Sequence, residues 1–417
     1  MRKLITWLSL SLGWVIFAPG IWTFLNNSVQ SVKGDREQIA VAQQPVNPTP
    51  EQPLPLQLIN SNNGEFSLES LGIDEQLWDR PGKPGDKQAL LASIDNSLRY
   101  LRTSKAAQAY QNYQIPGITL NRVRRSLVRF RQIVVAAKSA EELQVAVNRE
   151  FIFYKSIGRN NQGSVLFTGY FEPIYLASRT PSAEYRYPLY RIPPNLNQWP
   201  KPHLTRLELE GADGLGTNSP LRGLEFVWLR DRFEAFLVHV QGSAQLKLTD
   251  GSVMTVGFAG KTDLPYSSVG RAMIDDGKFT PEQLTMPVMI DYFKQFPEEM
   301  NRYLQRNESF IFFKETNGAP PMGSIGVPVT AERSIATDKS LMPPGALALI
   351  KAPIPYPNAD GKQESQLVSR YVLDQDTGSA IKGPGRVDIF MGTGVVAGER
   401  AGIIKANGEL YYLLLKK

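Results

Sequence analysis

The chain has 417 residues, of which 42% are hydrophobic, and a formal net charge of +6. This length predicts two or three domains, and the composition is typical of a globular protein. The absence of cysteine excludes disulfides, thiol nucleophiles, cysteine–zinc sites and lipid attachment at a cysteine. The basic residues are scattered along the chain, so we expect no nucleic-acid partner.

The only histidines, His203 and His239, are too few for a histidine-rich metal site. His239 lies in the apolar run from Phe236 to Val240, which we interpret as a strand. We therefore expect His239 to be a hydrogen-bonded residue of a sheet rather than a catalytic base. We predict neither a metal nor a cofactor.

The N-terminus has the features of an export signal. Arg2 and Lys3 precede an apolar stretch from Leu4 to Leu25, which is broken by Pro19 and Gly20. The stretch is long enough to remain as a membrane anchor, whereas the proline and glycine would also end a cleavable signal. We assign residues 1–42 to an export signal or anchor and expect membrane contact only there.

A proline-rich segment from Gln43 to Pro55 follows, and it predicts a semi-extended linker that cannot build a core. We extend this linker to residue 63. Apolar residues then recur at helical spacing, which predicts helices near 90–101, 123–134 and 143–154. Asp86 is the expected start of the first helix, and Ser139 with Glu142 forms a predicted capping box at the third.

From Ser164 onward, short apolar runs between turns predict strands. The expected strands are 165–167, 225–228, 236–240, 245–248, 253–256, 310–313, 346–350, 367–373, 386–390, 402–405 and 410–415, with helices at 269–275 and 281–302. A helical first part followed by a largely β part favours barrels over a sheet with helices on both faces.

A glycine-punctuated run from Asp376 to Phe390 carries the main candidates for chemistry. Strand alternation sets Asp388 opposite the apolar residues at 387 and 389. If its face lines a cleft, burial raises the pKa of the Asp388 carboxyl and makes it a proton donor. Asp376 lies where a turn leaves a strand, and its negative charge would favour a protonated neighbour. A third acid, Asp338, lies upstream.

The residues Asp376-Thr377-Gly378-Ser379 also match the signature of aspartic proteases. That signature normally follows an apolar strand, but here Asp374 and Gln375 precede it. Two copies are needed, and the chain has no second one. We therefore do not predict a protease.

Six motifs in a fixed order carry a resemblance to a known family. They are Thr168–Pro173, His239–Ala244, Gly257–Gly260 with Pro265–Arg271, Asn307–Phe313, Arg333–Asp338 and Asp376–Phe390. Together they resemble the membrane-bound lytic murein transglycosylase A family, whose C-terminal domain is named for three aspartates. The resemblance covers roughly residues 66–415.

The resemblance implies a mainly β fold with N-terminal helices. A double-psi β-barrel catalytic domain at 64–175 and 315–417 would be interrupted by a smaller inserted β domain at 176–314, with a glycan groove between them. It also implies a cofactor-free lyase that cleaves the β-1,4 bond between N-acetylmuramic acid and N-acetylglucosamine without water. The product would carry a 1,6-anhydromuramoyl end.

Matched motif by motif, the resemblance assigns the catalytic acid to Asp388, a second groove aspartate to Asp376 and a third to Asp338. Lys382 and Arg386 are candidates for sugar or lactyl-carboxylate contacts. The groove would also be lined by six residues that could equally serve the fold: Tyr170, Glu172, Gln241, Ser243, Tyr266 and Arg271. The chain departs from the family pattern at Ala244 and at Lys261-Thr262-Asp263.

We expect an exported monomer of the periplasm or cell envelope that binds peptidoglycan strands and is not a lipoprotein. Two rivals stay open: a wall-binding module, barrel-shaped like the expansins, that holds glycan without cutting it, and a hydrolase that uses water. We expect exo-acting cleavage, but no residue distinguishes chain ends from interiors. Acceptance of crosslinked strands, subsite assignment and regulatory partners are equally open.

Overall fold

The computed structural model describes residues 53–59 and 68–417, so the expected export segment and most of the linker lie outside the described residues. Among the described residues, no helix is both long enough and apolar enough to span a membrane. Part of the predicted linker is ordered into strand β1, Leu56–Leu58, which pairs with β2, Phe151–Ser156. Burial of Leu56 in the core accounts for this strand.

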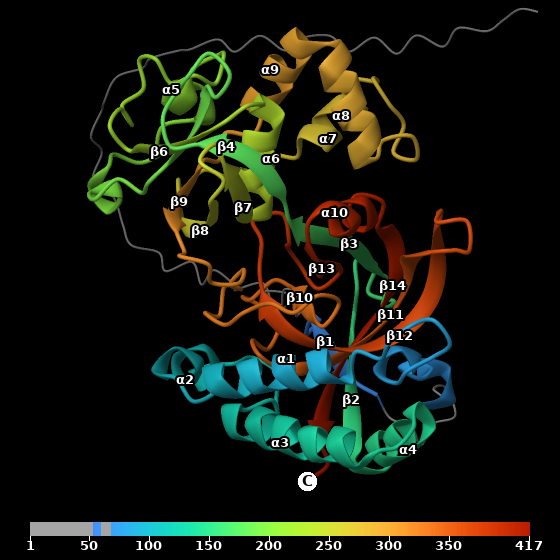
Figure 1. Ribbon diagram of the computed structural model, residues 1–417. Coiled ribbons are helices and arrows are strands. Elements are labelled where there is room, and N and C mark those ends of the chain that lie inside the picture. Colours follow the sequence, from blue (N-terminus) through green and yellow to red (C-terminus); the bar gives the residue numbers. More distant parts are fainter. Residues whose placement is uncertain (1–52, 60–67) are drawn as a thin grey trace, which may run out of the picture. The chain divides into compact units, whose positions relative to one another are not determined.

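Two short 3-10 helices, η2 (Leu68–Leu71) and η3 (Glu75–Leu77), precede four helices: α1 (Lys87–Tyr100), α2 (Ser104–Gln111), α3 (Leu120–Ala136) and α4 (Ala140–Glu150). Figure 1 shows these helices beside β2, β11, β12 and β14. Ser139 caps α4 by accepting a hydrogen bond from the Glu142 N–H at 3.2 Å. The predicted capping box is not completed, because the Glu142 carboxylate accepts from the Lys138 N–H at 2.9 Å instead. The expected helix stops at Glu150, because Phe151 and Tyr154 enter β2, which pairs on both sides.

Eight strands form the larger sheet: β1, β2, β3 (Val165–Glu172), β10 (Ser334–Ala336), β11 (Leu347–Pro357), β12 (Gln363–Asp376), β13 (Arg386–Thr393) and β14 (Lys405–Leu415). Six of them close into a ring in the order β14-β11-β12-β10-β13-β3, because β14 also pairs with β3. Closure leaves no free edge in the ring. The predicted barrel is confirmed.

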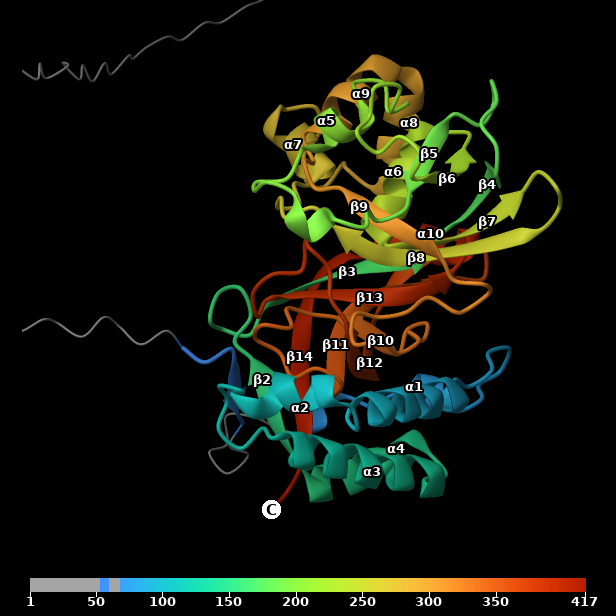
Figure 2. The ribbon, with the colours of Figure 1, turned by 90° about the vertical axis from the view of Figure 1, so that its left-hand side faces the viewer.

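The second sheet has six strands in the order β5-β6-β4-β7-β8-β9, and it is formed by chain between β3 and β10 (Figure 2). The strands are β4 (Ile174–Ser178), β5 (Tyr187–Tyr190), β6 (Glu225–Leu229), β7 (Ser243–Leu248), β8 (Val253–Lys261) and β9 (Ile311–Glu315). Its helices are η4 (Leu196–Gln198), α5 (Arg206–Glu210), α6 (Arg232–Gln241), α7 (Val269–Asp275), α8 (Met286–Gln295) and α9 (Pro297–Gln305). Its apolar clusters are distinct from the barrel core.

The strand expected at 236–240 is wrong, because these residues lie in α6. Asp231 caps this helix by accepting the Glu234 N–H at 2.9 Å, and Gly242 ends it at φ 82°. Because α6 is buried on several sides, its sequence lacks the alternation of apolar and polar faces that marks a surface helix.

His239 is buried in this helix and accepts the Ile311 N–H at 3.2 Å. Burial and then Arg206 lower its pKa well below the usual value, so it is a neutral, structural residue.

Two further boundaries differ from the prediction. The helix expected at 281–302 starts at Met286 and is divided into α8 and α9, with Pro297 at the first position of α9. The strand expected at 402–405 is absent, because helix α10, Val395–Ala401, ends there and β14 begins only at Lys405.

A buried ionic network ties the segment before α1 to the barrel. The Arg333 guanidinium is fully buried and donates to Asp86 at 2.9 Å and to Asp74 at 3.2 Å. Arg370, also buried, pairs with Asp86 and with Glu332. Asp86 therefore precedes α1 without capping it by its side chain, because its carboxylate is used by these two arginines.

Candidate active site

Strand register brings the two main aspartates into one row. Strand β10 lies between β12 and β13, and its Ala336 faces Asp376 on one side and Asp388 on the other. Strand β3 continues the row, since Thr168 is the register partner of Asp388. Residues opposite each other on neighbouring strands point to the same face. The row therefore collects on one face residues that are up to 220 positions apart in the chain.

Asp388 is partly exposed and has one fixed hydrogen-bond partner. The Thr168 hydroxyl donates to Oδ1 of Asp388 at 2.7 Å. Burial by the surrounding protein raises the pKa of Asp388 to about 6, although the Thr168 bond and the positive charge of Arg386 oppose that rise. Asp388 can therefore hold a proton close to neutral pH and release it easily, as an acid–base group requires.

Asp376 ends β12 and is held by three donors. The Tyr170 hydroxyl donates to Oδ2 at 2.8 Å, and the backbone N–H groups of Ser324 and Thr377 donate to Oδ1, each at 2.8 Å. Burial raises the pKa of Asp376, whereas these hydrogen bonds favour the charged form. The Tyr170 ring also packs on Phe390, with ring centroids 5.2 Å apart. Asp376 is thus a rigid neighbour of Asp388.

Asp338 has a different environment. Its Oδ1 accepts from the Ser340 hydroxyl at 2.6 Å, and its Oδ2 accepts from the Gly383 N–H at 2.9 Å. Burial opposes ionisation, but these bonds together with the charge of Lys382 lower its pKa. Gly383 has φ 79°, which a side chain rarely adopts. Asp338 therefore fixes the glycine turn that carries Lys382.

The structure also reveals a buried carboxylate that the sequence analysis did not select. Asp374 is fully buried, and it accepts from the Thr337 hydroxyl at 2.8 Å and the Tyr412 hydroxyl at 2.7 Å. Lys339 pairs with it and also donates to the backbone oxygen of Asp376. The alternation of Asp374 and Asp376 along one strand was the available signal.

Two of the predicted groove residues connect the barrel to the second sheet. Glu172 is buried, and its Oε2 accepts from Gln245 at 3.0 Å and from Thr393 at 2.9 Å. Burial raises the pKa of Glu172 despite those bonds. The Gln241 side-chain oxygen accepts the Phe171 N–H at 2.9 Å. These contacts fix the end of β3.

The remaining predicted contacts differ in their relation to Asp388. Tyr266 belongs to its surroundings: burial raises the tyrosine pKa, and the charges of Arg386 and Asp388 act on it as well. Lys382 is exposed, and Arg386 is partly exposed. Ser243 begins β7 and faces Gly257 in the register of β8. Arg271 points along its own helix, where it pairs with Asp275 at 2.8 Å on an exposed surface.

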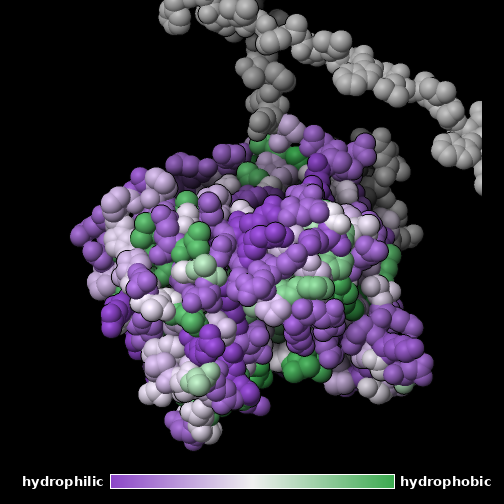
Figure 3. Space-filling model, turned by 90° about the horizontal axis from the view of Figure 1, so that it is seen from above, coloured by the Kyte–Doolittle hydropathy of each residue, from purple (hydrophilic) through white to green (hydrophobic). Residues whose placement is uncertain are grey.

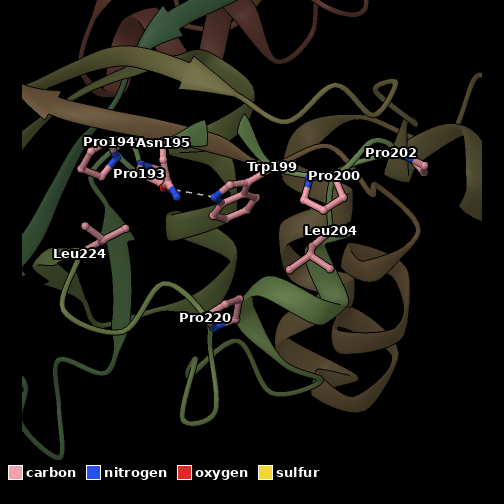
Figure 4. A pocket seen from close by; sticks show the side chains of 9 residues that line it. All are labelled: Pro193, Pro194, Asn195, Trp199, Pro200, Pro202, Leu204, Pro220 and Leu224. Atoms are coloured by element: carbon pink, nitrogen blue, oxygen red, sulfur yellow. Dashed lines mark hydrogen bonds between the residues drawn. The ribbon is translucent and has the colours of Figure 1, made fainter. Parts of the chain in front are cut away.

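Within residues 53–59 and 68–417, no group of three or more histidine, cysteine, aspartate or glutamate side chains is arranged to hold a metal. A pocket of about 550 Å³ lies in the segment that forms the second sheet and its helices (Figure 4). It is lined by five prolines and by Leu204, Leu224, Asn195 and Trp199. It contains none of the aspartates. On the face shown in Figure 3, hydrophilic residues surround small, separate apolar groups.

Comparisons with known proteins show the family to which the chain belongs. A family model described as the MltA specific insert domain matches residues 166–314, and one described as the 3D domain matches residues 333–414. The membrane-bound lytic murein transglycosylase A of Vibrio cholerae is 34% identical over 263 residues, covering 62% of this chain and 68% of that protein. The chain belongs to the membrane-bound lytic murein transglycosylase A family.

The chain is also similar to other members of the family in sequence and in fold. The protein of the same name from Escherichia coli K12 is 34% identical over 258 residues, covering 61% of this chain and 67% of the relative. A crystal structure of a membrane-bound lytic murein transglycosylase from Agrobacterium tumefaciens matches with a TM-score of 0.64 at 29% identity, covering 79% of this chain and 93% of that one. The E. coli family member with bound chitohexaose matches with a TM-score of 0.64 at 25% identity, covering 87% and 95%.

Proposed function

We propose that this protein is a lytic transglycosylase that cleaves the β-1,4 bond between N-acetylmuramic acid and N-acetylglucosamine in peptidoglycan and leaves a 1,6-anhydromuramoyl end. The observation that carries the proposal is the partly exposed Asp388, whose pKa is raised to about 6 by burial. Membership of a family whose named members are lytic murein transglycosylases supports the choice of substrate.

In the proposed reaction a single carboxyl acts twice. Protonated Asp388 gives its proton to the glycosidic oxygen as the C1–O bond of the muramic residue breaks. The resulting carboxylate then removes the proton of the C6 hydroxyl of the same sugar, whose oxygen bonds to C1. The proton returns to Asp388, and no water enters the products. Glycosidases with two carboxyls differ, because one of these activates water or forms a covalent intermediate.

Asp376 would stabilise the positive charge that develops on the sugar. The backbones at Asp376 and Asp388 are separated by two strand spacings, roughly 9 to 10 Å. Both residues are register partners of Ala336, so their side chains lie on the same face of the sheet. Besides burial, the negative charge of Asp376 also raises the pKa of Asp388, which supports an electrostatic role for Asp376. The hydrogen bond from Tyr170 favours the charged form that this role requires.

The proposal includes the domain division and the location. We assign the catalytic domain to 64–175 and 315–417 and the inserted domain to 176–314, with strands grouped as in the two sheets. Arg386 and Tyr266 lie close enough to Asp388 for their charges to interact, and the charge of Lys382 acts on Asp338. These three residues are the proposed substrate contacts, together with Ser243 and Arg271. Relatives named as membrane-bound support an exported protein of the cell envelope.

The test is mass spectrometry of the fragments that the purified protein releases from sacculi. Anhydromuramoyl ends would support the proposal. Reducing muramic ends would instead identify a hydrolase with water as the acceptor. Retention of the protein on sacculi without any release would identify the binding-only alternative.

A further inference from the structure

The charge of Arg386 acts on Asp388, and the charge of Lys382 acts on both Asp338 and Lys261. None of these three cations is bound to a carboxylate among the described residues. Among residues 53–59 and 68–417, no ion pair involves the ammonium of Lys261 or Lys382 or the guanidinium of Arg386, and the buried Nε of Arg386 has no hydrogen-bond acceptor. Arg232 and Arg370 also have an Nε without an acceptor, but each of them is paired with an acid. A buried donor without a partner is costly unless a ligand supplies the acceptor.

The cations come from both sheets. Lys261 ends β8 in the second sheet, where it faces Ile311 of β9. Lys382 lies in the glycine turn that Asp338 fixes in the barrel. Burial and then the charge of Lys382 lower the pKa of Lys261, so the two ammonium groups are close enough to repel each other. Such repulsion is relieved when an anion binds between like charges.

The nearest acid to Lys261 along the chain is already engaged. Asp263 accepts the His203 N–H at 2.8 Å, and its own N–H donates to Nδ1 of His203 at 3.1 Å. Asp263 does attract Lys261, but burial and Lys382 outweigh that attraction. The repulsion of Lys261 by Lys382 is therefore larger than its attraction by Asp263.

We propose that Lys261, with Lys382 and Arg386, binds a carboxylate carried by the muramic residue and makes the enzyme selective for anionic glycan strands. This inference rests on the proposed function. The lactyl group at O3 distinguishes muramic acid from glucosamine, and it ends in a free carboxylate or in a stem peptide that carries carboxylates. Both sources share the chemistry that the three cations recognise.

Binding can be measured without cleavage in Asp388→Asn. Three probes are used: glycan strands with stem peptides, strands stripped of peptides with free lactyl carboxylates, and the stripped strands with these carboxylates converted to methyl amides. We expect at least one charged probe to bind about fivefold more tightly than the neutral probe, a modest effect because the cations are partly solvated. The difference should decrease with added salt.

Adding Lys261→Gln should reduce binding of the charged probe to near that of the neutral one, while Lys261→Arg should retain the preference. Lys247→Gln is the matched control, because Lys247 is an exposed lysine on β7 of the same sheet. A preference for the peptide-bearing or the stripped strands identifies the source of the carboxylate. Thermal unfolding of each variant confirms that it is folded.

Equal binding of all three probes, or a preference that survives Lys261→Gln, would overturn the inference. The proposed function is tested separately by the native protein. If it releases no anhydromuramoyl ends while the charge preference persists, only the proposed function fails. If it releases them from charged and neutral strands with the same kcat/KM, only the selectivity fails.

Discussion

The hydroxyl of Thr168 lies 2.7 Å from Oδ1 of Asp388 and donates a hydrogen bond to it. The two residues are register partners on the parallel strands β3 and β13, so the backbone itself fixes this contact. A hydrogen bond to a carboxylate favours its charged form. Thr168 thereby limits how far burial raises the pKa of Asp388, which lies at about 6.

Replacing Thr168 with valine should move the pH dependence of the reaction. In the proposed reaction the free enzyme needs protonated Asp388, so kcat/KM should fall as the pH rises through about 6. Thr168→Val removes a bond that favours the carboxylate, so the pKa rises and the fall occurs at higher pH. The profile of kcat/KM from pH 4 to 9 measures this. Thr168→Ser keeps the donor and should keep the native profile; an unshifted Thr168→Val profile would contradict the assigned role.

Asp388→Asn should lower turnover on peptidoglycan by about 10²- to 10⁴-fold, the usual contribution of a general acid and base. Binding of strands should persist, because the amide has nearly the same shape. Turnover is measured by release of anhydro products and binding by retention on sacculi. Asp360→Asn, in an exposed turn between β11 and β12, is the control and should keep native turnover. Native turnover in Asp388→Asn would exclude Asp388 as the acid.

The buried network predicts a large stability effect at Arg333. Arg333→Met leaves Asp74 and Asp86 without their shared cation, and Asp74 is fully buried. Breaking such a pair costs about 3 to 5 kcal/mol in the free energy of unfolding. Urea unfolding measures the loss. Arg131→Met breaks an ion pair with Asp95 whose two side chains are 41% and 48% exposed, and it should cost less than about 1 kcal/mol. Similar losses in both variants would disprove the network's importance.

Glu332 should make stability depend on pH in acid. Burial opposes its ionisation, but Arg370 and Arg400 outweigh burial and lower its pKa from 4.5 to about 2. Its contribution is complete above about pH 4.5, and it is lost as the pH falls toward 2; the difference corresponds to about 3 kcal/mol. Unfolding free energies at pH 3 and pH 6 test this. In Glu332→Gln the drop between these pH values should be smaller, and an equal drop would assign it to other groups.

The barrel and the strand that carries Asp388 could be predicted from the sequence. Val387 and Ile389 flank Asp388 with apolar residues that predict a buried strand. The resemblance assigned Asp376 and Asp338 to the same groove, and strand register places Asp376, but not Asp338, in the row with Asp388. The helix around His239 was not recognised, because residues 236–238 are all buried and show no helical period. Its signals were at the ends, where Asp231 and Gly242 are common helix caps.

The long-range ion pairs had no local signal. Asp86 looks like a helix cap in sequence, but its partners Arg333 and Arg370 are 247 and 284 positions away. The motif around Arg271 also did not show where the Arg271 side chain points. In the structure Arg271 pairs with Asp275, one helical turn later. Such contacts depend on which strands become neighbours, and this is decided by the closed sheet rather than by adjacent residues.

Strand β14 joins β11 to β3 and follows the other five strands of the ring in the chain. Until β14 is in place, β3 has an unpaired edge, and the Thr168 backbone lacks its partner Lys405. A chain that has not yet been synthesised to β14 would therefore hold both aspartates in an open sheet. The closed ring that holds the row of aspartates would then be complete only when the last strand of the chain has paired.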